Sequence, residues 1–138
     1  MDDAPVRLGR ALVAAFAVFW LVFRLVPIVV GVGSAHEVAA VLEALWGGDE
    51  TLIVASSDLS HFHPYTEAQQ IDASTTTRIE AKESTLRGEE ACGAYALNGL
   101  LRAAQARGLQ VRTLDTRNSG DTAGDRFRVV GYGAYALT

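Results

Sequence analysis

The chain has 138 residues, of which 49% are hydrophobic and 20% charged, enough for one domain with a hydrophobic core. Its formal net charge of -4 argues against a nucleic-acid-binding surface, because such surfaces are usually basic. The single cysteine, Cys92, cannot form an internal disulfide, so nothing in the composition indicates an oxidising compartment. We therefore expect a cytoplasmic globular protein.

The first feature in chain order is an apolar run over residues 11–32. A run of this length is a candidate membrane-spanning helix, and Arg7 and Arg10 precede it as they would on a cytoplasmic side. Arg24 and Pro27 fit poorly in the middle of such a helix. A membrane anchor through residues 11–32 is therefore the alternative to a cytoplasmic protein.

Part of this run also has the pattern of a buried parallel strand. Residues 23–31 are rich in β-branched side chains and end at Gly31. The residues left before this strand, 11–22, are too few to span a bilayer alone. Residues 1–22 are then an apolar leader, either a helix or a membrane segment.

A helix is predicted from Ala35, because Ser34 can cap it and apolar residues recur at helical spacing up to Leu45. The apolar run over residues 52–55 indicates a second buried strand, over residues 51–55. A strand, a helix and a second strand form a βαβ unit with parallel strands. The chain is therefore expected to be an α/β protein, in full or in part a three-layer domain.

Further helices are predicted over residues 66–81 and 89–107, and strands over residues 109–116 and 126–137. Residues 117–125 carry turn chemistry. One side of the second helix is made of small residues, which would let it approach another surface closely: Cys92, Ala96, Gly99 and Ala103.

The strand at residues 51–55 leads into Ser-Ser-Asp-Leu-Ser-His-Phe-His-Pro-Tyr, residues 56–65. Ligands of open α/β sheets bind beyond the carboxyl ends of strands, so Asp58, His61 and His63 are the first candidates for chemistry. Imidazole can bind a metal or move a proton, and a carboxylate three residues earlier can orient the ring or be a second ligand. A structural loop remains the alternative, and His63 is the weakest of the three candidates.

Cys92 falls near the start of a predicted helix, where the helix dipole stabilises a thiolate. The alternative is a small buried hydrophobic residue, the commoner role of a free cysteine. Asp72 lies in the middle of a predicted helix and is expected at the surface. Asp121 beside Gly120 is expected to serve the turn.

Five blocks of this sequence resemble the MEMO family, in the family's order: residues 23–31, 56–61, 91–93, 118–121 and 129–132. The resemblance covers residues 23–138 and only the C-terminal part of a full-length member. It implies a three-layer α/β/α domain like that of the class III extradiol dioxygenases, with the N-terminal half of the family fold missing.

The resemblance also implies a pocket in which Asp58, His61 and Cys92 are the catalytic residues. His61 would be the acid/base group and a metal ligand, and Cys92 a soft ligand or a nucleophile. The implied metal is iron or copper, ahead of zinc. Full-length members supply two further pocket histidines that His36 does not match, so the ligand shell of this chain is expected to be incomplete.

The leading functional hypothesis is metal-dependent redox or oxygen chemistry. The resemblance implies AMMECR1-like and radical-SAM proteins as partners, as for bacterial members. It also implies the alternative of a non-enzymatic protein- or peptide-binding module, since eukaryotic members act as adaptors. A membrane-tethered domain and a poorly stable remnant, with an exposed sheet edge and apolar surface, are the remaining alternatives.

Overall fold

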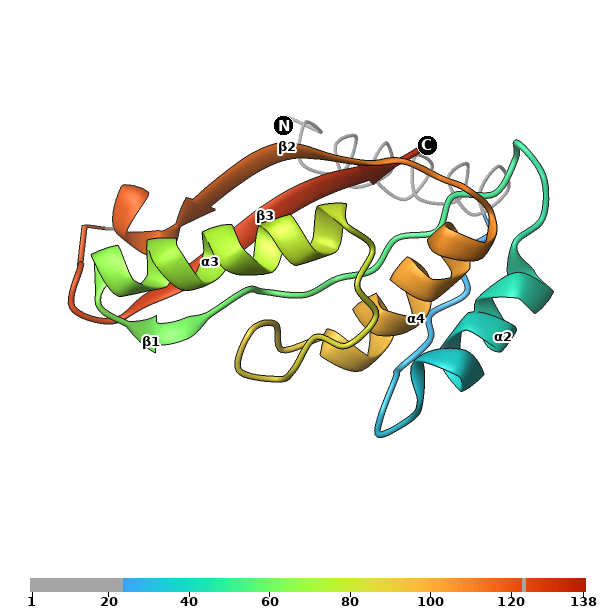
Figure 1. The fold of residues 1–138 in the computed structure, drawn as a ribbon, viewed down its shortest axis with the longest axis horizontal. Helices are drawn as coiled ribbons and strands as arrows, with labels where there is room; N and C mark the ends of the chain where they lie inside the picture. The colour runs from blue at the N-terminus through green and yellow to red at the C-terminus, as the bar shows by residue number, and fades with distance from the viewer. Residues whose placement is uncertain (1–23, 123) are drawn as a thin grey trace, which may run out of the picture.

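The computed structural model describes residues 24–122 and 124–138, which form a small α/β fold as expected (Figure 1). Its elements in chain order are α2 (Ala35–Leu45), β1 (His61–His63), α3 (Tyr65–Glu80), α4 (Ala94–Ala106), β2 (Val111–Asn118), the 3-10 turn η1 (Ser119–Asp121) and β3 (Val129–Leu137).

The sheet has three strands in the order β1-β3-β2, and both pairings are antiparallel. Strands β2 and β3 form a long hairpin in which Val111 lies opposite Leu137 and Asn118 lies opposite Gly131. Helix α3 runs along this hairpin, whereas α2 and α4 pack together beside it (Figure 1). Among the described residues the sheet is therefore covered by one helix, and the expected three layers are not present.

The prediction of a parallel βαβ unit is wrong for the described residues. Residues 24–31 and 51–55 form no strand and run as stretched segments without a neighbouring strand (Figure 1). β-Branched side chains favour extended backbone, but a strand also needs a partner for its N–H and C=O groups. No described segment supplies that partner, and Val29 and Leu52 remain 98% and 85% exposed.

The helices follow their local signals. Ser34 caps α2 through a reciprocal box, because its hydroxyl accepts from the Glu37 N–H and the Glu37 carboxylate accepts from the Ser34 N–H. The helix predicted over residues 66–81 is α3. The helix predicted from residue 89 begins only at Ala94, because residues 88–93 form turns.

The main core joins the motif segment to the helices. Its buried members are Leu59, Ile79, Leu86, Ala94 and Leu101. Leu59 comes from the motif and Leu101 from α4, so the two segments that carry the candidate site residues are anchored in one hydrophobic cluster. Burial of this kind is the main favourable term in folding.

Helices α2 and α4 approach closely, as the small residues of α4 predict. A Cβ atom added to Gly99 would lie only 2.2 Å from Cγ1 of Val38. At the C-terminal ends of the two helices, the Arg107 guanidinium donates two hydrogen bonds of 2.8 and 2.6 Å to the Glu43 carboxylate.

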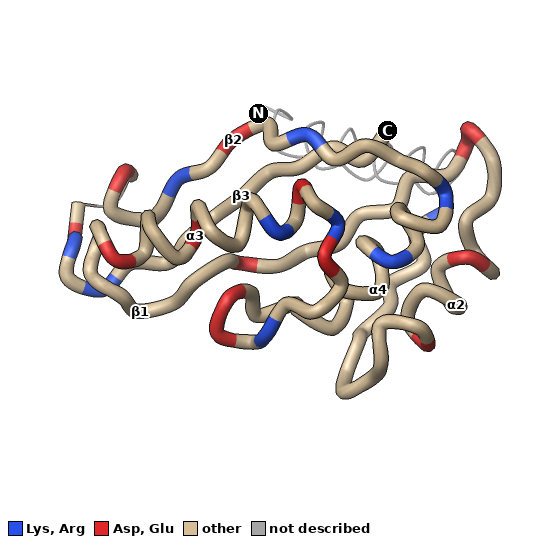
Figure 2. Tube along the Cα trace, viewed as in Figure 1, with Lys and Arg blue, Asp and Glu red and all other residues tan. Residues whose placement is uncertain are grey.

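Charged residues of both signs are interspersed along the described trace (Figure 2). No helix among the described residues is long and apolar enough to cross a bilayer. Of the expected membrane segment, residues 24–32 are not helical. Residues 11–23 of that segment, and the predicted leader over residues 1–22, lie outside the described part of the chain.

Candidate metal site

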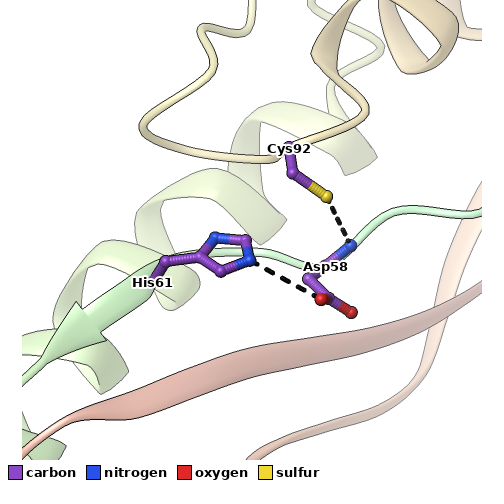
Figure 3. A group of neighbouring side chains, drawn as sticks. All are labelled: Asp58, His61 and Cys92. Atoms are coloured by element: carbon purple, nitrogen blue, oxygen red, sulfur yellow. Dashed lines mark hydrogen bonds and ion pairs between the residues drawn. The ribbon is translucent and has the colours of Figure 1, made fainter.

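Three of the predicted site residues converge at one end of the motif. Asp58, His61 and Cys92 each present a ligand atom, and these atoms all lie within 4.8 Å of one another (Figure 3). His61 Nε2 lies 3.6 Å from Asp58 Oδ2. Asp58 and His61 come from the segment that enters β1, and Cys92 comes from the turn before α4. The structure thus brings two distant parts of the sequence to one cluster.

Asp58 and Cys92 are joined by two hydrogen bonds, one to the Cys92 side chain and one between backbones. The Asp58 N–H donates to Cys92 Sγ at 3.3 Å, and the Cys92 N–H donates to the Asp58 carbonyl oxygen at 3.2 Å. These two reciprocal hydrogen bonds fix the position of the Cys92 turn relative to the motif segment.

The motif segment is held on both flanks. The Leu59 N–H donates to the Gly131 carbonyl at 2.8 Å, and the Gly131 N–H donates to the Ser60 carbonyl at 2.8 Å. On the other side, the Ser60 N–H donates to Asp72 Oδ1 on α3 at 2.9 Å. Asp58 and His61 therefore flank a short piece of backbone that is clamped between β3 and α3.

Asp72 contradicts the expectation of a surface position, because it is only 7% exposed. Its carboxylate passes so close to β3 that a Cβ atom added to Gly131 would lie 2.0 Å from Asp72 Oδ2. The available signal was the helical stripe of Ala68, Asp72, Thr75 and Ile79, all of them buried. The acid on that stripe is satisfied by a backbone N–H of the motif.

The backbone kinks between the two motif histidines. Phe62 has a φ of 63°, in the left-handed region that side-chain-bearing residues rarely adopt, and the pairing register of β1 shifts there. His63 is directed elsewhere and lies 2.9 Å from Glu67 through its Nδ1 atom. The ligand cluster contains neither His63 nor His36, so the weaker rank given to His63 is consistent with the geometry.

Arg78 anchors the connection that leads to Cys92. Its guanidinium donates to Glu83 at 2.8 Å, to the Thr85 carbonyl at 3.1 Å and to Glu90. Burial works to raise the pKa of Glu90, but the bonds from Arg78 and from the Arg87 N–H outweigh it and lower that pKa. Glu90 is therefore held as a carboxylate two residues before Cys92.

Asp121 serves the turn, as predicted. Its carboxylate accepts from the Asn118 N–H at 2.8 Å and from the Tyr65 hydroxyl at 2.6 Å. The Tyr65 hydrogen bond lowers the pKa of Asp121 and raises that of Tyr65. Asp121 borders a polar hollow of the surface that does not include the ligand cluster.

The donor set fits a single metal ion. Oxygen, nitrogen and sulfur ligands bind at about 2.0–2.3 Å, which separates neighbouring ligands of a tetrahedral ion by roughly 3.3–3.8 Å. The His61–Asp58 separation of 3.6 Å falls in that range, and all three candidate ligand atoms lie within 4.8 Å of one another. The site is also open, since the side chains of Asp58 and His61 are 48% and 29% exposed and Cys92 is exposed.

Comparison with known proteins gives the family. A family model described as Memo-like protein matches residues 13–136. The chain belongs to this family. The match begins before residue 23, where we expected the resemblance to start. It covers Asp58, His61 and Cys92.

Several curated relatives match this Memo-like chain at similar sequence identity. It is 32% identical to a MEMO1 family protein of Aeropyrum pernix, over 81% of this chain and 44% of that protein. Matching MEMO1 family proteins of Methanosarcina acetivorans and Sulfolobus acidocaldarius are 32% and 30% identical, over 47% and 43% of their lengths. The chain thus spans less than half the length of these relatives.

Proposed function

We propose that this Memo-like chain binds one iron or copper ion through Asp58, His61 and Cys92 and supports metal-dependent redox or oxygen chemistry like that of a dioxygenase. The observation that carries the proposal is the convergence of the three ligand atoms within 4.8 Å. Their residue types add to it, because thiolate and imidazole suit iron, copper and zinc. Zinc ranks last because it has no redox chemistry.

The open geometry favours a reactive site over a purely structural one. Structural metal sites are usually closed by four protein ligands, whereas reactive sites keep a position for water or substrate. Three ligands from this chain would leave such a position, and the exposure of Cys92 gives access to it. A bound ion would supply Lewis acidity and electron transfer.

His61 has two proposed roles that exclude each other at one nitrogen. A ring nitrogen that coordinates an ion cannot also move a proton, so Nε2 is the ligand when the site is loaded. The acid/base role belongs to His61 when the ring is free. Asp58 would orient the ring in that state, because its Oδ2 lies 3.6 Å from Nε2.

The non-enzymatic alternative, a protein- or peptide-binding module, also has one observation in its favour. Apolar side chains stay exposed along the stretched segments, including Val29, Val32, Leu52 and Val54. Exposed apolar patches often mark interaction sites. AMMECR1-like and radical-SAM proteins remain the proposed partners, and the cytoplasm the proposed location, on the strength of the family resemblance.

The metal proposal is tested by elemental analysis of the purified protein and three variants. Wild type should hold iron or copper near one ion per chain, and His61→Ala and Cys92→Ala should each lose it. His63→Ala is the matched control, because His63 is a motif histidine outside the cluster. Metal absent from folded wild type, or retained in both ligand variants, would refute the proposal and move the weight to the binding module.

A further inference from the structure

The hydroxyl of Ser57 lies between the two segments that supply the ligands. Its Oγ accepts a hydrogen bond from the Gly93 N–H at 2.9 Å and donates one to the Asp58 carbonyl at 2.7 Å. The same oxygen lies 3.8 Å from Cys92 Sγ. This one partly buried hydroxyl thus contacts Gly93, Asp58 and Cys92.

Polar contacts are what hold the Cys92 sulfur in place. The Cys92 side chain is exposed, so burial in the core does not fix its rotamer. The contacts that reach it come from the Asp58 N–H and from Ser57 Oγ. The Asp58 carbonyl that accepts from the Cys92 N–H is the same carbonyl that accepts from Ser57.

The close approach of the two segments at this point requires a glycine. A Cβ atom added to Gly93 would lie 2.8 Å from Ser57 Cβ and 3.0 Å from the Ser56 carbonyl oxygen. The neighbouring backbone leaves no space for it. The absence of a side chain at Gly93 therefore lets the turn that carries Cys92 contact the Ser57 hydroxyl directly.

We propose that Ser57 is a positioning residue, whose hydroxyl ties the Asp58 segment to the Cys92 turn and sets the Cys92 sulfur at ligand distance from Asp58 and His61. The assignment rests on the proposed metal function for its consequence, but its contacts do not. Residues behind the direct ligands commonly change metal affinity by about 10- to 100-fold when replaced.

The test compares Ser57→Ala with Ser56→Ala, a matched control whose exposed side chain makes none of these contacts. Each protein is titrated with Co2+, whose sulfur-to-cobalt charge-transfer absorption reports on Cys92. Ser57→Ala should bind Co2+ about tenfold more weakly and lose most of that absorption at saturation. Ser56→Ala should match wild type in both readouts, and circular dichroism would establish that the variants are folded.

A metal-free readout separates this proposal from the metal function. Hydrogen exchange of the Gly93 and Cys92 amides should speed up several-fold in Ser57→Ala. The Gly93 N–H loses its acceptor, the Ser57 hydroxyl, and the Asp58 carbonyl that accepts from the Cys92 N–H is no longer held by that hydroxyl. Gly93→Ala is a second variant that pushes the segments apart from the opposite side, and it should give the same changes.

The outcomes separate cleanly. Unchanged Cys92 exchange in Ser57→Ala would overturn the positioning role, as would unchanged Co2+ affinity and absorption in a wild type that binds Co2+. A wild type that binds no Co2+, with faster Cys92 exchange in Ser57→Ala, would support the tie between segments and count against the proposed metal site, which the iron and copper analysis tests separately.

Discussion

Residues 24–60 and residues 61–138 use similar apolar side chains with opposite results. In the second region Leu101 and Val129 are 2% and 0% exposed, because helices and strands cover them. In the first region, outside α2 and the end of the motif, Val29 and Leu52 are almost fully exposed. The difference shows that a β-branched run specifies extended backbone by itself, whereas its burial depends on a neighbour that the described residues do not supply.

The largest expected effect separates the two regions by stability. Leu101→Ala should lower the free energy of unfolding by about 2–5 kcal/mol, because it opens a cavity in the main core. Leu52→Ala should change it by less than about 0.5 kcal/mol, because the side chain is exposed. Urea unfolding measures both. Similar costs for the two variants would mean that residues 51–55 are buried in solution and would break the comparison.

A second prediction concerns the place where the motif joins the compact region. Gly131→Ala should cost about 1–3 kcal/mol, since the new methyl group would collide with the Asp72 carboxylate that holds the Ser60 N–H. Gly88→Ala is the control, because nothing lies within 4 Å of its added Cβ. Thermal unfolding of both variants checks this. Equal melting temperatures would contradict the close packing of Asp72 on β3.

The smallest expected effect is a pH dependence of the connection before Cys92. The pKa of Glu90 is lowered in the folded state, so the carboxylate contributes stability above its unfolded pKa near 4.5. That contribution should be lost as the pH falls through the lower, folded pKa. Glu90→Gln should therefore be less stable than wild type at neutral pH and closer to it in acid.

Urea unfolding across pH 3 to 7 measures this trend, with Glu89→Gln as the neighbouring exposed control. A stability difference between Glu90→Gln and wild type that stays constant across this range would show that the Arg78 contacts do not depend on the charge of Glu90.

Local signals predicted much of the fold. The Ser34 capping box, the alternation of β2 and β3 and the turn at Asn118–Asp121 are each determined by residues near in sequence. The parallel unit failed because strand pairing is a long-range property that an apolar run does not specify. The same limit explains β1, a part of the motif for which no strand was predicted and which becomes a strand only by pairing with β3.

For the candidate site, the sequence predicted the residues but not the contacts that bring them together. The residue types and their family resemblance identified Asp58, His61 and Cys92. Their convergence depends on contacts between segments, and neither Asp72 beneath the motif nor Ser57 beside Cys92 could be assigned a role from its neighbours in sequence. A buried acid on a helical stripe was the one readable hint.

The most direct test of the central claim is X-ray absorption spectroscopy at the metal edge of the protein loaded with one equivalent of copper or iron. The account predicts a sulfur neighbour near ~2.3 Å together with nitrogen or oxygen neighbours at about 2.0–2.2 Å. The sulfur should disappear in Cys92→Ala and persist in His63→Ala. A shell of nitrogen and oxygen alone in the wild type would contradict a site built on Asp58, His61 and Cys92.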